Sequence, residues 1–310
     1  DEYFPNWISY HKPEDPEENA LGYAKLHRDF ALKYFCDSKI QAQYAALNKL
    51  HKKSRNEKYI NCLDTPLEET SILYEAYEGT GMNCNPYALF LTALKDQRLK
   101  NYSHVWSISS WQLIAQLEKK WKNYPNVSFV LRGSENYFKA LSRCKYLINN
   151  HSFPPYFSKK EGQVLITSWH GITVKTIGFD FPTGKLESWN QTRIYLQTDW
   201  FLAANDFMKN NLATAYKMQD IFHGKVLVEG YPRNDFLVNS DRAQIFNQLS
   251  EHGIQADSGK KIILYAPTWK GEKFSSPSID LERLDAEIES LKSNIDLDQY
   301  QVLIKPHQVV

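Results

Sequence analysis

The segment Val164–Gly171, VLITSWHG, joins a short apolar run to a Trp-His-Gly turn. The run predicts a buried strand over 164–168, and the turn places His170 just past the carboxyl end of that strand. Ligands bind at this end of an open α/β sheet, because the loops there open into a crevice. Gly171 permits close approach of backbone or substrate. A single histidine after a strand is nevertheless more often a packed or capping residue, so the segment alone only nominates a site.

The same alternation of short strands and helices extends to both sides of this segment. Helices are expected over 86–94 and 111–120, the first with Asn85 as its capping residue and Pro86 at its first position. Short β-rich runs alternating with helices predict a parallel sheet wound on both faces. The strands are expected at 71–77, 104–108, 127–132, 146–149, 164–168, 200–204 and 225–229.

A second unit of this kind is expected after the turn at 230–235. The helix 242–250, the strand 261–266, the helix 281–292 and the strand 301–305 follow in order. Two strands do not complete a doubly wound sheet, so we expect the second domain to continue beyond residue 310. The opening at Asp1, without Met, indicates that residues also precede this sequence. The expected domains are a helical segment at 1–66, a Rossmann-like domain at 67–238, and the start of a second Rossmann-like domain at 239–310.

The helical segment carries a basic end. Apolar residues recur at helical spacing between 17 and 58, and Lys49, Lys52, Lys53 and Arg55 follow. Two interpretations remain open: a helical pair packed on the main body, or a basic surface that contacts anionic lipid or an anionic polymer.

Composition and absent motifs exclude several classes of function. The net charge of +1 gives no reason to expect a nucleic-acid partner. No apolar run approaches the ~20 residues of a spanning helix. The four cysteines form no C-x-x-C pair and are typical of reduced thiols in a cytoplasmic protein. There is no phosphate loop and no complete dinucleotide fingerprint. Asp296 and Asp298 are interpreted as solvated surface, so we expect neither a protein-held metal nor a cofactor.

Polar residues follow four of the predicted strands. His170 follows one, and Arg233 lies in the turn Gly-Tyr-Pro-Arg-Asn-Asp after another. Each is also compatible with an ordinary turn, but together they predict a cationic cleft between two sheets for a phosphate-bearing ligand. The remaining two strand ends carry Thr268 with Lys270 and Lys305 with His307.

These motifs, in this order, resemble those of the CDP-glycerol glycerophosphotransferase family, which includes teichoic-acid and capsule polymerases. The family's Trp-His-Gly-Thr-Pro-Leu-Lys motif corresponds to 169–175, where Ile-Thr-Val replaces Thr-Pro-Leu. Its Gly-Tyr-Pro-Arg-Asn-Asp motif is intact at 230–235, and its Tyr-Ala-Pro-Thr-Trp-Arg motif corresponds to 265–270 with Lys at 270. The resemblance covers about 71–307, including an opening strand with Glu75, and leaves out the residues before about 67.

The resemblance implies a GT-B fold, in which two Rossmann-like domains face a cleft. It also implies that His170 is the general base and that His307 helps to hold the donor phosphates. The residues implied for the donor phosphates are Arg233, Thr268, Lys270 and Lys305, and those implied for the acceptor are Trp169, Gly171 and Lys175.

The implied activity is transfer of glycerol phosphate or ribitol phosphate from a CDP-activated donor to a growing teichoic-acid or capsular polymer, with release of CMP. The implied partners are the CDP-polyol and an anionic polymer, lipid-linked forms included. The implied location is the cytoplasm, at the inner face of the plasma membrane. Two alternatives stay open: a GT-B glycosyltransferase that uses a nucleotide sugar, and a non-catalytic module that binds polymer.

Overall fold

The computed structural model describes residues 55–181, 188–251, 253–254, 259–267 and 281–305. The chain divides into two compact units, which part between Asp235 and Phe236. Residues 1–54, which hold most of the expected N-terminal helical segment, lie outside the described residues. The end of that segment forms the short helix α4 (Arg55–Ile60). Nothing in the described part is long and apolar enough to be a membrane-spanning helix.

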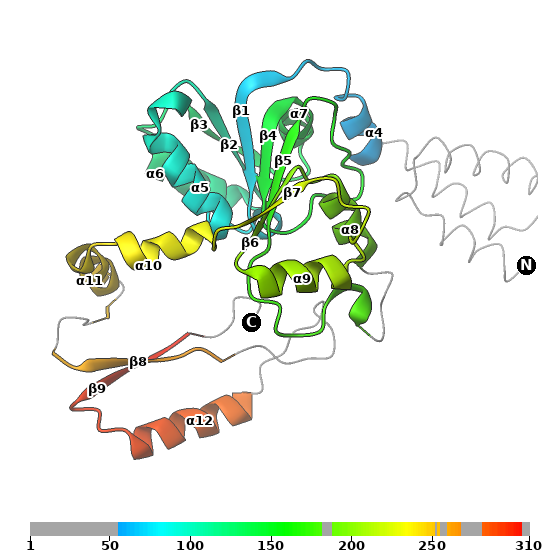
Figure 1. Ribbon diagram of the computed structural model, residues 1–310. Coiled ribbons are helices and arrows are strands. Elements are labelled where there is room, and N and C mark those ends of the chain that lie inside the picture. The colour runs from blue at the N-terminus through cyan, green and yellow to red at the C-terminus, as the bar shows by residue number, and fades with distance from the viewer. Residues whose placement is uncertain (1–54, 182–187, 252, 255–258, 268–280, 306–310) are drawn as a thin grey trace, which may run out of the picture. The chain divides into compact units, whose positions relative to one another are not determined.

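The first unit is built on a parallel sheet (Figure 1). Its strands are β1 (Glu68–Glu75), β2 (Ser103–Ile108), β3 (Val127–Leu131), β4 (Cys144–Asn149), β5 (Val164–Ser168), β6 (Trp200–Ala203) and β7 (Lys225–Val228). In the described part of the chain they lie in the order β3-β2-β1-β4-β5-β6-β7. The chain therefore builds outward from β1 to β3, then returns and builds the other half from β4, which is the doubly wound arrangement.

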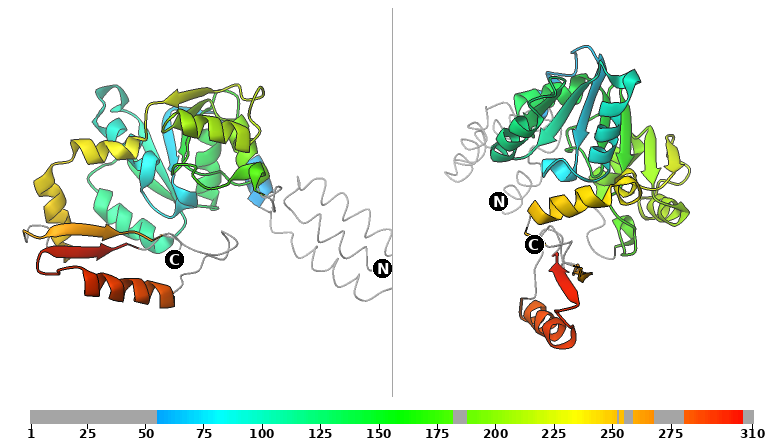
Figure 2. Two further views of the ribbon diagram at one scale, coloured as in Figure 1. Left: turned by 60° about the horizontal axis from the view of Figure 1, so that its bottom comes forward. Right: turned by 90° about the vertical axis from the view of Figure 1, so that its left-hand side faces the viewer.

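Helices cover both faces of this sheet, as the right-hand view of Figure 2 shows. Besides α4, the described helices of the unit are α5 (Cys84–Lys95), α6 (Trp111–Trp121), α7 (Glu135–Arg143), α8 (Trp189–Leu196) and α9 (Asp206–Ala215). Short 3-10 turns are η1 (Tyr77–Gly79), η2 (Gln97–Leu99), η3 (Gly178–Asp180) and η5 (Pro232–Asn234).

Side chains that alternate along the strands form one hydrophobic core on each face of the sheet. In β1, Ile72 and Tyr74 face α5 and α6, in a cluster that includes Phe90 and Trp106. Leu73, between them, faces the other way and packs with residues of α4, α7 and α8, including Phe138. Successive side chains of a strand point to opposite faces, so a strand buried on both faces is apolar at nearly every position. All seven strands expected from the sequence are present, with ends that differ by at most three residues.

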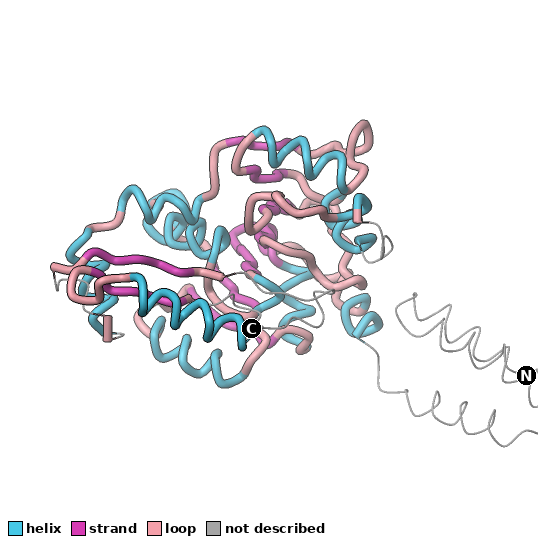
Figure 3. Tube along the Cα trace, turned by 90° about the horizontal axis from the view of Figure 1, so that it is seen from below, coloured by secondary structure: helices cyan, strands magenta, loops and turns pink. Residues whose placement is uncertain are grey.

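The second unit is a short β-α-β element. After α10 (Asp235–Asn239) and α11 (Arg242–Glu251), the strands β8 (Lys261–Tyr265) and β9 (Tyr300–Ile304) pair in parallel. The helix α12 (Leu281–Asn294) lies between them in the sequence, and Figure 3 shows it as a cyan coil running beside the two magenta strands. The Tyr265 hydroxyl donates to a carboxylate oxygen of Glu287 on α12, which ties the helix to β8. The expected second α/β pattern is thus present over the described residues.

Candidate active site

The carboxyl ends of β1 and β4 are the place where the strand order reverses. Glu75, the last residue of β1, is in register with Asn149, the last residue of β4. The loops that leave these two strands run to opposite halves of the sheet. In α/β proteins, ligands commonly bind where strand order reverses in this way. The loop after β5, which carries His170, lies next to it because β5 pairs with β4.

His170 is held by a backbone group of the neighbouring loop. Its Nδ1 lies 2.9 Å from the carbonyl oxygen of Asn150. A carbonyl oxygen only accepts hydrogen bonds, so Nδ1 carries the proton. In the neutral ring Nε2 therefore keeps its lone pair, which is the tautomer that a base acting through Nε2 needs.

Aromatic rings fix the plane of this imidazole. Trp169 stacks on His170 with ring centroids 4.2 Å apart, and Tyr77 meets it edge-on at 5.1 Å. A second imidazole, His151, lies 5.8 Å from His170 and 6.4 Å from Trp169. Residues from three strand ends thus form one cluster of rings around His170.

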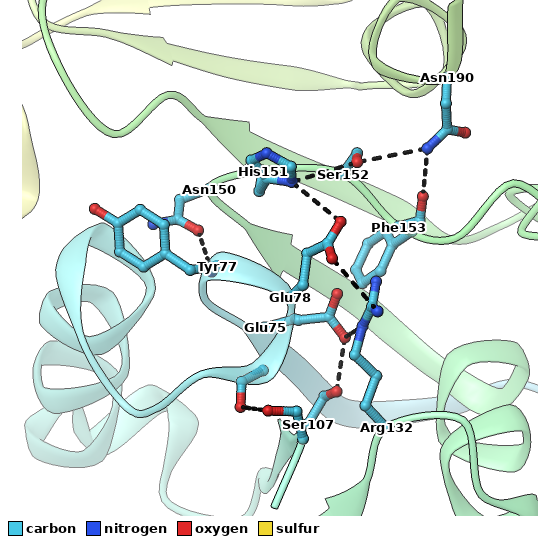
Figure 4. Close-up of polar contacts among 12 residues, drawn as sticks. Glu75, Tyr77, Glu78, Ser107, Arg132, Asn150, His151, Ser152, Phe153 and Asn190 are labelled. Carbon is cyan, nitrogen blue, oxygen red and sulfur yellow. Dashed lines mark hydrogen bonds and ion pairs between the residues drawn. The ribbon is translucent and has the colours of Figure 1, made fainter. Parts of the chain in front are cut away.

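A buried carboxylate, Glu75, lies below Glu78 and His151 in the view of Figure 4. Glu75 has a side chain only 2% exposed, and it pairs with Arg132 Nε at 3.3 Å. The Ser107 hydroxyl donates to Glu75 Oε2 at 2.6 Å. Burial raises the pKa of Glu75, and the positive charge of Arg132 opposes that rise. These groups come from the carboxyl ends of β1, β2 and β3.

Arg132 also connects the buried carboxylate to the ring cluster. Its guanidinium lies 3.7 Å from Glu78 Oε2, and the other oxygen of Glu78 lies 3.5 Å from His151 Nδ1. Interaction with His151 and, less strongly, with Arg132 lowers the pKa of Glu78. Glu78 is therefore a carboxylate at neutral pH, placed between a guanidinium and an imidazole.

Asn85 does not cap a helix, so that expectation is wrong. The helix α5 begins one residue earlier, at Cys84. The fully buried side chain of Asn85 instead donates to Trp169 O at 2.9 Å and to Ser168 Oγ at 3.2 Å. Its Oδ1 accepts from the backbone N–H of Arg233 at 3.2 Å. Tertiary partners outcompete the local cap because they satisfy three polar groups at once.

Arg233 lies beside His170, as the strand-end argument requires. Its guanidinium donates to His170 O at 2.8 Å and lies 3.2 Å from Cys84 Sγ. The Tyr231 hydroxyl donates to Gly171 O at 3.1 Å. Tyr231 and Arg233, at the two ends of the Tyr-Pro-Arg turn, therefore both hold the Trp-His-Gly loop in place. Contact of Arg233 with a phosphate stays a prediction.

Replacing Asn85 with Leu tests this connection. We expect the variant to lower the free energy of unfolding of the first unit by about 1–3 kcal/mol, because buried polar groups lose their partners. Urea unfolding followed by tryptophan fluorescence measures it. Asn123→Leu, at an exposed position of the same unit, is the matched control. Equal unfolding midpoints for the two variants would contradict the role assigned to Asn85.

The remaining predicted residues are less closely grouped. Lys175 is exposed in the loop after β5, and Lys305 is exposed at the end of β9 in the second unit. Thr268, Lys270 and His307 lie outside the described residues. Over the described ranges, no three His, Cys, Asp or Glu side chains are grouped as a metal site would require.

Sequence reasoning missed His151, Glu78 and Arg132. The rule that nominated His170 would also have found His151, which comes two residues after the expected strand 146–149. Glu78 and Arg132 give no such signal, because their importance depends on which strands are neighbours.

The strand order defines a Rossmann-like α/β unit, and polar groups lie at the strand ends where such units commonly bind ligands. Residues 58–310 match the model of the CDP-Glycerol:Poly(glycerophosphate) glycerophosphotransferase family. The chain therefore belongs to this family.

Individual relatives agree with the family match. The teichoic acid poly(glycerol phosphate) polymerase of Bacillus spizizenii is 26% identical over 253 residues, which cover 79% of this chain and 61% of that protein. The teichoic acid glycerol-phosphate transferase of Staphylococcus aureus is 27% identical over 256 residues, which cover 77% and 60%. The chain thus spans less than two thirds of the length of these relatives.

A solved structure extends the agreement to the fold. The wall teichoic acid polymerase TagF matches with a TM-score of 0.62 and 23% identity, over 87% of this chain and 65% of that one. This similarity confirms the expected α/β class and GT-B type of fold.

Proposed function

We propose that this chain carries the catalytic region of a polymerase that transfers glycerol phosphate from CDP-glycerol to the end of a growing teichoic-acid polymer and releases CMP. Ribitol phosphate and capsular polymers are the variants of donor and acceptor that the same chemistry allows. The family match and the named relatives support the proposal. In this proposal the acceptor binds mainly to the first unit and the CDP-polyol mainly to the second.

The observation that carries the proposal is the state of His170. Its Nδ1 is committed to Asn150 O, so Nε2 can take the proton of an acceptor hydroxyl. The hydroxyl oxygen attacks the phosphorus that bears the glycerol, a new P–O bond forms, and the P–O bond to CMP breaks. CMP leaves with the electron pair of that bond.

Most of the catalysis would come from positioning and from charge stabilisation, as in other phosphoryl transfers. In the proposal, Thr268, Lys270, Lys305 and His307 neutralise the donor phosphates, Arg233 assists them, and Lys175 lies on the acceptor side. Trp169 and Gly171 would shape the acceptor site beside His170. Roles for these residues rest on the motifs and on the placement of Trp169, Gly171 and Arg233 around His170.

Incubation of the full-length protein with radiolabelled CDP-glycerol or CDP-ribitol tests the donor class. We expect label in acid-precipitable polymer with one of them and stoichiometric release of CMP. Phosphorus NMR should show phosphodiester linkages in the product. Incorporation from neither donor would overturn the proposal, and a glycosidic product would select a nucleotide-sugar transferase instead.

We further propose that the protein works at the inner face of the membrane on a lipid-linked acceptor. The support is the basic run Lys49, Lys52, Lys53 and Arg55 in the sequence, because such runs favour anionic lipid surfaces. Co-sedimentation with phosphatidylglycerol vesicles should fall when the three lysines are replaced by glutamine. Unchanged co-sedimentation would exclude this basic run as the contact.

A further inference from the structure

The second imidazole, His151, has the geometry of a ligand-binding group. It comes two residues after β4, at the point where the strand order reverses, and its side chain is 30% exposed. Its ring lies between Trp169 and the loop after β1. It is therefore within reach of a molecule that also contacts His170.

Glu78 determines which ring nitrogen of His151 is offered to that molecule. A carboxylate only accepts hydrogen bonds, so Nδ1 of His151, 3.5 Å from Glu78, carries a proton. Nε2 is then the nitrogen left for a ligand, and in the protonated ring it donates. The charged groups that face this ring are Glu78 from η1 and, behind it, Arg132 after β3. The other neighbours of the ring are Ser152, Trp169 and the ring of His170.

The backbone of the loop after β1 is strained where it places Tyr77 and Glu78 beside the two imidazoles. Tyr77 and Glu78 both have positive φ, at 44° and 58°. A non-glycine residue in this region costs about 1–2 kcal/mol, so two in succession persist only where other contacts hold them. The contacts are those of Tyr77 with His170 and Asn150, and those of Glu78 with His151 and Arg132. The strained turn thus aims both side chains at the two imidazoles.

The two imidazoles are close enough for one glycerol phosphate unit to contact both of them. The ring centroids of His151 and His170 are 5.8 Å apart. In a terminal glycerol phosphate, the free hydroxyl oxygen and the phosphorus are joined through three carbons, a span of about 6 Å for extended single bonds of about 1.5 Å each. A ribitol unit inserts two more carbons and spans more than this.

We propose that His151 binds the phosphate of the acceptor's terminal unit through Nε2 while His170 faces the terminal hydroxyl, so that the two rings select an acceptor ending in glycerol phosphate. The proposal rests on the function proposed above and adds a residue and a substrate preference to it. Glu78 is the positioning residue for His151, and Arg132 holds Glu78.

Equilibrium binding of synthetic tri(glycerol phosphate) to the full-length protein, followed by tryptophan fluorescence, tests the inference without turnover. The neutral oligomer of glycerol, without phosphate, is the reference ligand. We expect His151→Gln to weaken binding of the phosphate oligomer about 10- to 100-fold, the effect of one charge-assisted hydrogen bond. The matched control is His223→Gln, an exposed histidine of the same unit, which should bind as the wild type does.

The neutral oligomer separates binding by His151 from a merely structural effect. A general disturbance of the site should weaken binding of both oligomers, whereas loss of the phosphate contact in His151→Gln should weaken binding of the phosphate oligomer alone. Glu78→Gln should cause a smaller loss with the same selectivity, because it keeps the His151 ring and removes the carboxylate that orients it.

The outcomes distinguish this inference from the proposed function. Wild-type affinity in His151→Gln, or equal binding of the phosphate and neutral oligomers by the wild type, would overturn the inference. Protein that binds tri(glycerol phosphate) through His151 but incorporates no label from either CDP-polyol would overturn the proposed function alone.

Discussion

Replacing His170 with asparagine is expected to reduce kcat for glycerol-phosphate transfer by about 10²–10⁴-fold, the usual contribution of a general base. Asparagine can still donate from Nδ2 to Asn150 O, so the contact that fixes the loop has a substitute. It cannot accept a proton from the acceptor hydroxyl. The loss should therefore fall on the chemical step rather than on the fold.

Steady-state kinetics with CDP-glycerol and a glycerol-phosphate primer measure this effect. We expect KM for CDP-glycerol to change only a few-fold, because the proposed function has the donor bind mainly to the second unit. His223→Asn serves as the control for replacing a histidine of the first unit away from the site. Folded His170→Asn protein with wild-type kcat would remove His170 from the role of base.

The ion pair beneath the site should have the largest effect on stability. Arg132→Met is expected to lower the free energy of unfolding of the first unit by about 3–5 kcal/mol, since it leaves the charge of Glu75 buried without its partner. The control is Arg143→Met, which breaks the half-exposed pair with Glu68. An exposed pair of this kind contributes about 0–1 kcal/mol.

The loss in Arg132→Met should also depend on pH. Burial raises the pKa of Glu75, so the folded state keeps the proton to a higher pH than the unfolded state does. Stability therefore falls as the pH rises from the ordinary carboxyl value, about 4.3, towards the raised value. Without Arg132 the pKa of Glu75 in the folded state rises further. The pH range over which stability is lost then extends to higher pH.

Urea unfolding at pH 5 and pH 8 measures this difference. We expect the deficit of Arg132→Met to be smaller at pH 5 than at pH 8. Combining Glu75→Gln with Arg132→Met should remove the pH dependence of the deficit. It should also recover part of the free energy of unfolding, because no carboxylate charge is then buried at position 75. A deficit of the same size at both pH values would show that lost packing, and not the charge of Glu75, causes it.

Local patterns predicted much of the architecture. The alternation of short apolar runs with helices located all seven strands of the first unit, and the run at 164–168 matches β5 residue for residue. This succeeds because a strand buried on both faces is rich in apolar residues, whichever strands lie beside it. The expected Asn85 cap fails for the opposite reason: its side chain takes partners from β5 and from the turn at 230–235, which no local pattern reveals.

The sequence by itself determined that this protein has a parallel α/β unit with His170 at the carboxyl end of a buried strand. Only the tertiary structure decided which strand ends meet there. Because β1 pairs with both β2 and β4, Glu75, Arg132 and His151 come together although they are far apart in the sequence. Strand order depends on pairings between distant segments, and these are selected by the energy of the whole sheet rather than by the residues of any one strand.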